Sequence, residues 1–312
     1  MFTSTGAVRS GLISAAVLVL LAGPAHAQTT LKYKFKEGDK LNYATEMTQK
    51  QTMNIMGNEV ETTTTQNMDM TWNVTTVKDG KAQISQTIDR IRMKVDSAFG
   101  GFDFDSKDGK EPEGPIGMIV GPVLNAMAGA EFTVTMTEQG DVSETKLSEK
   151  LIEAIKSNPI LQQMGGAFTE EGMKNMIGQQ GGSVLPKEAV KKGDTWNHKT
   201  ELKMPPIGVM KISNTYTYRG PEDRDGAKVE KIDVKTEMTI EPLADAAAQF
   251  EFKVKSSEAK GTMYFDNKAG RIVATTMNTK MAMEISAMGN VIDMVQDQTT
   301  TLKLVKERTS GE

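Results

Sequence analysis

Residues 66–76 read QNMDMTWNVTT, and apolar and polar side chains alternate along the whole stretch. The even positions carry Met68, Met70, Trp72 and Val74, while the odd positions carry Asn, Asp and Thr. A period of two residues is typical of a β-strand with one buried and one wet face, as antiparallel sheets show. The stretch therefore predicts one strand of an antiparallel sheet.

The same period recurs along most of the chain, in segments separated by short turns rich in Asp, Asn and Gly. The segments are 43–55, 132–136, 212–218, 232–240, 250–254, 277–285 and 300–304. Strands joined by short polar turns form a meander. The predicted fold class is therefore mainly β (α+β), a large curved antiparallel sheet or half-barrel made of two related β-meander units, with helices packed on the concave side.

A short cassette occurs twice, as FKEGDKLNYATEM at 35–47 and VKKGDTWNHKTEL at 190–202. Each copy is followed by alternating strands, an Asp-Gly pair, an interruption and a strand–turn–strand unit, in the same order. That order indicates an internal duplication of a β-rich unit. We expect the shared Gly and Asp to form a tight turn into a first strand, with Gly at a positive φ.

The interruptions carry the predicted helices. Residues 114–130 place apolar side chains at helical spacing, although Pro122 and several glycines predict a short or broken helix. Residues 242–249 are the shorter counterpart in the second unit. Between the units, residues 147–157 show an amphipathic pattern, and Thr169 is placed to cap a further helix.

These features divide the chain into a signal peptide, two repeats and a linker. The predicted boundaries are 1–27 for the signal peptide, 28–145 for the first β-rich repeat with an apolar helical insertion near 115–129, 146–185 for the helical linker and 186–312 for the second β-rich repeat.

The first residues have the form of a secretory signal peptide. Arg9 precedes the apolar run 11–22, and Ala25-His26-Ala27 supplies an A-x-A cleavage site. The run is shorter than the roughly 20 apolar residues of a membrane span. We therefore expect cleavage after Ala27, a mature chain without a stable membrane span, and a periplasmic or secreted location. A retained N-terminal anchor is the alternative.

Composition excludes several classes of function. The chain has no Cys, so disulfides, thiolate nucleophiles and Cys-based metal sites are absent from its chemistry. It has 37 basic and 41 acidic residues, which argues against nucleic acid as a partner. Aromatic residues make up 5% of the chain, whereas there are 22 Met residues, so Met must fill much of the interior.

Few side chains are suited to catalysis. Only His198 remains after signal removal, so a catalytic triad or a His-based metal site would depend on one imidazole. No nucleophile elbow, phosphate-binding loop or zinc-protease motif occurs. We therefore predict a non-enzymatic protein with no catalytic residues and no cofactor.

An acidic stretch at 102–114, FDFDSKDGKEPEG, brings Asp103, Asp105 and Asp108 close in sequence. Oxygen-rich loops of this kind can bind calcium, but the spacing departs from the EF-hand pattern, which needs Gly at position 6 and Glu at position 12. The three residues are a candidate calcium site. The departure from that pattern favours a plain acidic surface loop over the calcium site.

Methionines on the apolar positions of strands suggest a second kind of site. Flexible thioethers with few aromatic residues suit a cavity for a lipid-like ligand, but a plain Met-rich core has the same pattern, and thioethers also hold Cu(I). All three interpretations remain open. The residues predicted to line a ligand site are Met68, Met70, Trp72, Ile116, Ile119, Val123, Met281 and Met283.

The duplicated EGD/KGD cassette behind a signal peptide, followed by Thr- and Met-rich strands, resembles an uncharacterised family of secreted bacterial proteins of unknown function. A looser likeness is to the periplasmic lipoprotein carriers. It involves GTMYFDNKAGRIV at 261–273 and the apolar helix 116–127 as a plug. That likeness implies a curved, incompletely closed sheet that shelters acyl chains, although the carriers are about half as long.

The expected function follows from these points. The first hypothesis is a secreted binding or carrier protein for an apolar or amphipathic, lipid-like ligand in the cell envelope. The alternative is an envelope structural or protein-interaction module with a filled core, and the third is Met-based copper or acidic-loop calcium binding. The expected partner is a lipid or another apolar ligand, and nucleic acid is not expected.

Overall fold

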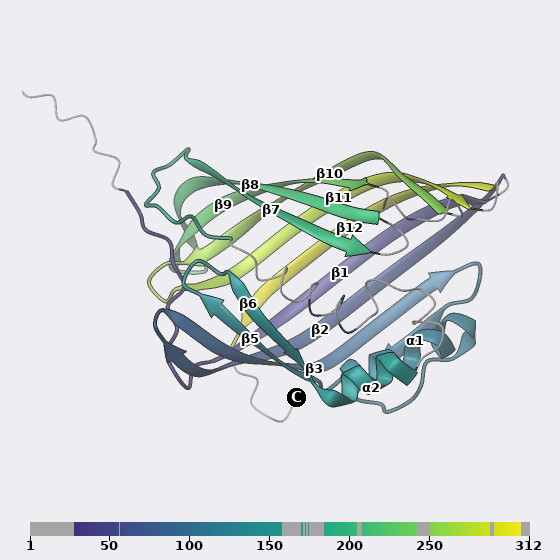
Figure 1. The fold of residues 1–312 in the computed structure, drawn as a ribbon, viewed down its shortest axis with the longest axis horizontal. Coiled ribbons are helices and arrows are strands. Elements are labelled where there is room, and N and C mark those ends of the chain that lie inside the picture. The colour runs from purple at the N-terminus through teal and green to yellow at the C-terminus, as the bar shows by residue number, and fades with distance from the viewer. Residues whose placement is uncertain are drawn as a thin grey trace, which may run out of the picture.

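The computed structural model describes residues 28–55, 57–157, 170, 172, 174, 184–204, 208–241, 250–287 and 290–306. In this part of the chain, twelve strands form one antiparallel sheet that curves around an interior (Figure 1). The strands are β1 (Lys40–Ile55), β2 (Asn58–Lys78), β3 (Lys81–Ser97), β4 (Phe102–Asp105), β5 (Glu131–Thr137), β6 (Val142–Leu147), β7 (Thr195–Met204), β8 (Gly208–Arg224), β9 (Ala227–Glu241), β10 (Phe250–Asp266), β11 (Arg271–Ala287) and β12 (Asn290–Val305). The predicted fold class, a large curved antiparallel sheet, is confirmed.

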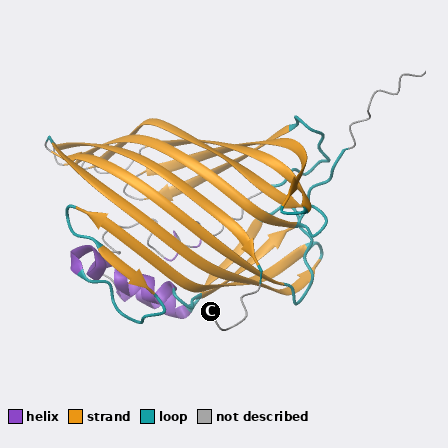
Figure 2. Cartoon of the chain, turned by 180° about the vertical axis from the view of Figure 1, so that it is seen from behind, coloured by secondary structure: helices purple, strands orange, loops and turns teal. Residues whose placement is uncertain are grey.

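Neighbouring strands follow the order β6-β5-β3-β2-β1-β12-β11-β10-β9-β8-β7, with β4 paired to β3 outside this path. The strands of the first predicted repeat, β1 to β6, form one half, and β7 to β12 form the other. The first and last strands join the halves, with residues 42–55 of β1 paired to 292–305 of β12. Figure 2 shows this continuous outer surface from behind. The sheet is open, and β6 and β7 are its two edges.

The two cassettes make the same turn, as expected. The N–H of Gly38 donates to the carbonyl of Val74 at 2.9 Å, and the N–H of Gly193 donates to that of Tyr218 at 2.8 Å. Both glycines have positive φ, 85° and 98°, and an added Cβ would meet no atom within 4 Å at either. The glycines are therefore required by the backbone conformation rather than by crowding.

The shared Asn also has the same role in both copies. The hydroxyl of Thr71 donates to Oδ1 of Asn42 at 3.0 Å, and the hydroxyl of Thr215 donates to Oδ1 of Asn197 at 2.8 Å. Each bond joins the first strand of its half to the second. The polar residues common to the cassettes thus hold strands together.

Strand β3 was not predicted, because its apolar residues do not alternate. Ile84, Ile88, Ile91 and Val95 are all buried, and their spacing of four, three and four residues resembles a helix. The register between β2 and β3 shifts at Asp89, which leaves one extra residue on β3. Such a β-bulge shifts the alternation of side chains by one residue. The residues after the bulge, Ile91 and Val95, therefore face the same side as Ile84 and Ile88 before it, which produces the helical spacing.

The acidic stretch 102–114 begins as strand β4 rather than as a loop. Phe102 and Phe104 are buried, and the intervening Asp103 is exposed. Nε of Arg90 donates to Oδ1 of Asp105 at 2.9 Å, and Nη2 of the same arginine contacts Oδ2. This ion pair, mainly through its hydrogen bonds, lowers the pKa of Asp105 to about 2. The interpretation of the whole stretch as a surface loop was wrong.

Two of the predicted helices are confirmed, α1 (Gly114–Met127) with Pro122 inside it, and α2 (Glu149–Ser157). Leu124 of α1 and Leu151 and Ile155 of α2 belong to one buried cluster with residues of β3, β4 and β5. The helices lie together at the β3 side of the sheet (Figure 1). The predicted helices at 242–249 and after Thr169, and the signal peptide at 1–27, lie outside the described residues, apart from isolated positions of the second helix.

Among the helices described here, none combines the length and the apolar character that crossing a membrane requires.

We predict that Gly38→Ala and Gly193→Ala each lower the free energy of unfolding by about 1 kcal/mol or more, because alanine is strained at positive φ. Urea denaturation measures this change. Glu37→Ala, at an exposed neighbouring position of the same turn, should change stability by less than about 0.5 kcal/mol. Equal stabilities for all three variants would contradict the assignment of the turn.

We also predict that Asp105→Asn lowers the free energy of unfolding at pH 7 by about 1–2 kcal/mol, since it leaves Arg90 without its carboxylate. The folded pKa of about 2 lies below the ordinary value near 3.9. The stabilisation is therefore present above about pH 4 and is lost as pH falls towards 2.

Unfolding measured from pH 7 down to pH 2 should show the two proteins converging at low pH. Asp103→Asn, on the same strand but exposed, is the control and should follow the wild type. A constant difference between Asp105→Asn and wild type at every pH would contradict the ion pair's contribution.

Candidate functional site

One face of the sheet is buried, and we call it the inner face. Paired residues of an antiparallel ladder point to the same side, so the register assigns each side chain to a face. The buried residues Tyr43, Tyr216 and Met283 all fall on this side. In eight strands, the inner-face positions are the odd residues of 41–53 and 275–285, the even residues of 60–74, 196–202, 210–218, 232–240 and 292–304, and residues 252, 254, 257, 259, 261 and 263.

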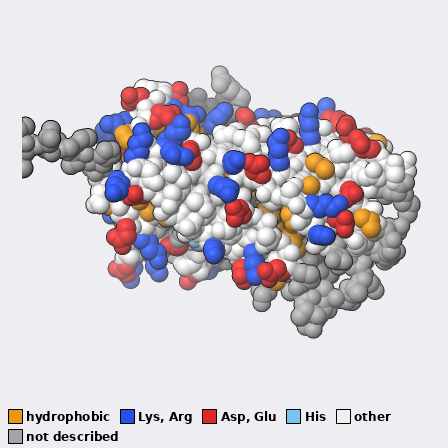
Figure 3. Space-filling view, turned by 90° about the horizontal axis from the view of Figure 1, so that it is seen from above, with side chains coloured by type: hydrophobic (Ala, Val, Ile, Leu, Met, Phe, Trp, Pro, Cys, Tyr) orange, Lys and Arg blue, Asp and Glu red, His pale blue; other side chains and the backbone are white. Residues whose placement is uncertain are grey.

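None of these inner-face positions carries Asp, Glu, Lys or Arg. The intervening positions of the same strands carry many, among them Lys255, Lys280 and Asp297. Charges on the outer face pair across strands, as in Lys255 with Glu284 at 2.9 Å and Lys280 with Asp297 at 3.4 Å. Figure 3 shows one side of the molecule, where basic and acidic side chains are interspersed. At these positions the strands therefore keep formal charge off the inner face, although at the closed end Glu230 accepts a hydrogen bond from Tyr218 and Arg271 lines the cavity beside Tyr43.

One end of the inner face is closed by the segment before β1, which crosses it in Figure 1. Leu31 and Tyr33 of this segment are buried against aromatic and aliphatic side chains of β8 to β10. Backbone hydrogen bonds tie the segment to three places far apart in sequence. They run from the N–H of Thr29 to the carbonyl of Val190 at 2.7 Å, from Tyr33 to Glu138 at 2.8 Å and from Lys34 to Gly270 at 3.1 Å.

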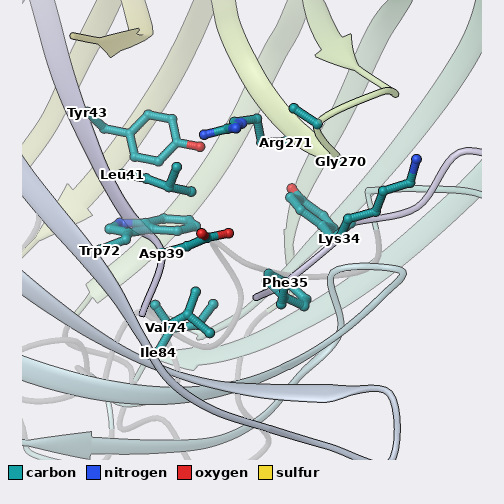
Figure 4. Close-up of a pocket in the computed structure, with 12 residues that line it drawn as sticks. Lys34, Phe35, Asp39, Leu41, Tyr43, Trp72, Val74, Ile84, Gly270 and Arg271 are labelled. Atoms are coloured by element: carbon teal, nitrogen blue, oxygen red, sulfur yellow. The ribbon is translucent and has the colours of Figure 1, made fainter. Parts of the chain in front are cut away.

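Aromatic side chains fill this closed end, as Figure 4 shows. The ring centroids of Tyr43 and Trp72 are 4.9 Å apart, and the hydroxyl of Tyr43 donates to the carbonyl of Ile272 at 3.2 Å. Burial raises the pKa of Tyr43 and of Tyr33 well above the ordinary value. The cavity lined by these side chains has a volume of about 20 Å³ available to the centre of a water molecule. This is room for one water and too little for a ligand.

A row of polar side chains crosses the middle of the inner face, and we call it the polar belt. Pairing in register brings its members side by side on β7, β8, β9, β11, β12, β1 and β2, with Ala259 of β10 completing the row. The polar belt consists of His198, Asn214, Thr236, Thr279, Gln298, Gln49 and Thr64. All seven are half-buried. The belt therefore offers uncharged hydrogen-bonding groups across seven strands.

Hydrogen bonds within and beside the belt use part of its capacity. Nε2 of Gln49 donates to Oε1 of Gln51 at 3.1 Å, and Nε2 of Gln298 donates to Oγ1 of Thr300 at 3.0 Å. Each amide has two N–H donors and an oxygen with two lone pairs. The amides therefore retain donors and acceptors beyond these bonds.

An apolar row lies beyond the belt, away from the closed end. It runs through Val254, Met283, Met294, Met53 and Val60 on β10, β11, β12, β1 and β2, which are paired in register. Three of its members, Val60, Met283 and Met294, are buried. We call this the methionine row. It lies four residues from the belt along β12, or about 13 Å at the usual rise of a strand.

The structure separates the predicted ligand-binding residues into three places. Met68 and Met70 of β2 and Ile116 of α1 pack against the buried cluster that joins the helices to β3, β4 and β5. Val123, also on α1, is half-buried. Trp72 lies at the closed end, and Met281 and Met283 lie in or beside the methionine row, about ten residues further along the strands. The side chain of Ile119 is outside the described part. The predicted residues therefore do not form one site.

A groove of about 940 Å³ opens where both edges of the sheet begin. Asp141, just before β6, contributes to one side of it. The segments 185–190 and 193–198 line the rest, and Nε1 of Trp196 donates to the carbonyl of Val184 at 3.2 Å. His198 belongs both to this groove and to the polar belt. The groove therefore gives access from outside to the first residue of the belt.

The predicted calcium residues do not come together as a set of ligands. The carboxylate of Asp105 is held by Arg90 and by the N–H of Lys107, at 3.0 Å from its Oδ1. Within the described ranges, no three His, Asp or Glu residues are grouped so as to hold a metal ion. His198, the remaining candidate for catalysis or metal binding, stands on a strand whose inner-face neighbours are uncharged.

The polar belt was missed from the sequence. Gln49, Gln298 and Thr279 occupy the same alternating positions as the apolar residues of their strands, so the sequence of each strand predicts that they face inward. What the sequence alone does not supply is the register that aligns them across strands.

Several solved structures show a distant likeness to this chain. An outer membrane channel from Pseudomonas putida F1 is 7% identical and covers 88% of this chain and 97% of its own, at a TM-score of 0.26. DynF, from the dynemicin biosynthesis pathway of Micromonospora chersina, is 9% identical and covers 96% and 94%, at 0.21. The β domain of the Bordetella autotransporter BrkA is 6% identical and covers 85% and 98%, at 0.26.

No curated protein matches the sequence. One family model does, that of a family of unknown function (DUF6263), over residues 79–272. The match runs from the turn between β2 and β3 to the beginning of β11 and so covers more than half of the chain. It agrees with the resemblance to an uncharacterised family. The chain belongs to the DUF6263 family, whose function is unknown.

Proposed function

We propose that this protein binds an apolar or amphipathic ligand on the inner face of its sheet, and that it does so in the cell envelope after export by its N-terminal signal peptide. The role is binding rather than catalysis. The observation that carries the proposal is the sorting of charge. The defined inner-face positions of eight strands carry no formal charge, which suits a ligand with a large uncharged surface.

The methionine row supports an apolar contact. Met53, Met283 and Met294 present unbranched thioether side chains, which adapt to irregular apolar shapes. Flexible methionines are common on surfaces that bind apolar partners. Met53 is half-buried, so an aliphatic chain laid across it would contribute part of the roughly 1.5–3 kcal/mol that full burial of a Met side chain is worth.

The polar belt argues against a filled core, the alternative function. Buried polar groups need hydrogen-bond partners, and native cores leave few unsatisfied. A plain core would gain nothing from Gln49 and Gln298 at its centre, since each amide would have to be satisfied at a cost in packing. Uncharged amides with remaining capacity are instead useful to a ligand or to water beside it.

Binding of the neutral fluorescent dye Nile red tests the proposal. We predict saturable binding to the purified mature protein, and displacement by an aliphatic amphiphile. Met53→Gln should weaken dye binding about tenfold, the equivalent of about 1.4 kcal/mol, because it removes apolar contact in the methionine row.

Thr52→Gln is the matched control, since Thr52 precedes Met53 on β1 and faces outward. It should leave the dye affinity within about twofold of wild type. Urea denaturation of both variants distinguishes loss of binding from loss of folding. Failure of the wild type to bind the dye, or equal weakening by both variants, would overturn the proposed site.

A further inference from the structure

We infer that the ligand of the inner face is an uncharged amphiphile, with its hydrogen-bonding head group on the polar belt and its aliphatic part towards the methionine row. This inference rests on the proposed function and adds the chemical class of the ligand. It follows from three observations on the inner face, namely the absence of charge at the positions defined above, the alignment of the belt and the order of belt and row.

The lack of charge sets the class of head group. A carboxylate, phosphate or ammonium group moved from water to the polar belt or the methionine row would lose its hydration and meet no opposite charge among the members of either row. The charged residues next to the belt residues in sequence, such as Lys50, Lys280 and Asp297, project from the opposite face. An ionised ligand would therefore be bound much more weakly than a neutral one of the same length.

The belt supplies the recognition that a neutral head group needs. Gln49 and Gln298 are directly paired, and Thr64 and Thr279 flank them on the next strands. Amides and hydroxyls both donate and accept hydrogen bonds. This matches hydroxyl, ester or amide groups, such as those of a monoacylglycerol or a neutral glycolipid.

The order of the elements gives the ligand a direction. The closed end is filled by aromatic residues around Tyr43, so an aliphatic chain cannot extend that way from the belt. The methionine row lies on the other side, about 13 Å from Gln298 along β12. The groove is lined by His198, a belt residue on the edge strand β7, and by no residue of the methionine row. The head group therefore lies nearer this edge of the sheet than the aliphatic chain does.

Three amphiphiles with the same twelve-carbon chain test the inference, namely monododecanoylglycerol, dodecanoate and dodecylammonium. Each is used below its micellar concentration at pH 8 to displace Nile red from the wild-type protein. We expect the monoacylglycerol to bind at least tenfold more tightly than either ion. An ion that binds as tightly as the monoacylglycerol, or displacement by none of the three while the dye binds, would overturn the inference alone. If Nile red does not bind to the wild-type protein at all, the proposed function itself is contradicted.

A substitution in the belt tests where the head group lies. Gln298→Glu adds one negative charge to the belt with almost no change of shape, and should weaken monododecanoylglycerol about tenfold while strengthening dodecylammonium. Thr299→Glu adds the same charge to the next residue, which is exposed on the outer face, and should change neither affinity by more than about twofold. Equal effects of the two substitutions would place the head group elsewhere, and the probe series on wild type decides the ligand class even if a variant fails to fold.

Discussion

The alternation of side chains along the strands is the constraint on which the structure depends. Because successive residues point to opposite faces, Glu46 and Lys50 of β1 stay in water while Gln49 and Met53 face inward. A slip of β1 by one residue would bring its charges onto the inner face, where they would lose their hydration. The same penalty applies to each of the eight strands, so the distribution of charge helps to fix the register of the whole sheet.

The two ends of the inner face are built differently, and this difference makes the sheet asymmetric along its strands. Backbone hydrogen bonds from the segment before β1 tie together the β5–β6 turn, the β10–β11 turn and the approach to β7. Burial of Leu31 and Tyr33 then completes an aromatic core at that end. Beyond it, the polar belt and the methionine row remain as an ordered surface. The pairing of β1 with β12 makes that surface continuous, because it joins the two halves of the sheet.

Much of this architecture could be predicted from the sequence. The alternation identified most strands, the repeated cassettes identified two equivalent turns, and the apolar spacing identified α1 and α2. Strand β3 was missed because the bulge at Asp89 gives its isoleucines helical spacing. Strand β4 was missed because its two buried phenylalanines lie among acidic residues that are typical of a loop.

The candidate site was harder to predict than the fold. Composition and periodicity indicated Met-rich inner positions, but they could not show that Met70 and Met283 are about ten residues apart along the sheet, or that helices cover Met68 and Met70. The polar belt depends on the pairing of eight strands from both halves of the chain, because Ala259 of β10 lies between Thr236 and Thr279. Such long-range register is set by the packing of the whole sheet, and no local pattern reports it.

Native mass spectrometry of the mature protein, isolated from its own host without detergent and then extracted with organic solvent, would show whether a small molecule occupies the inner face. We expect a complex of one protein with one small molecule, and an extract that contains a neutral amphiphile with hydroxyl, ester or amide groups. A mass equal to the polypeptide alone, or an extract dominated by an ionised lipid, would contradict it.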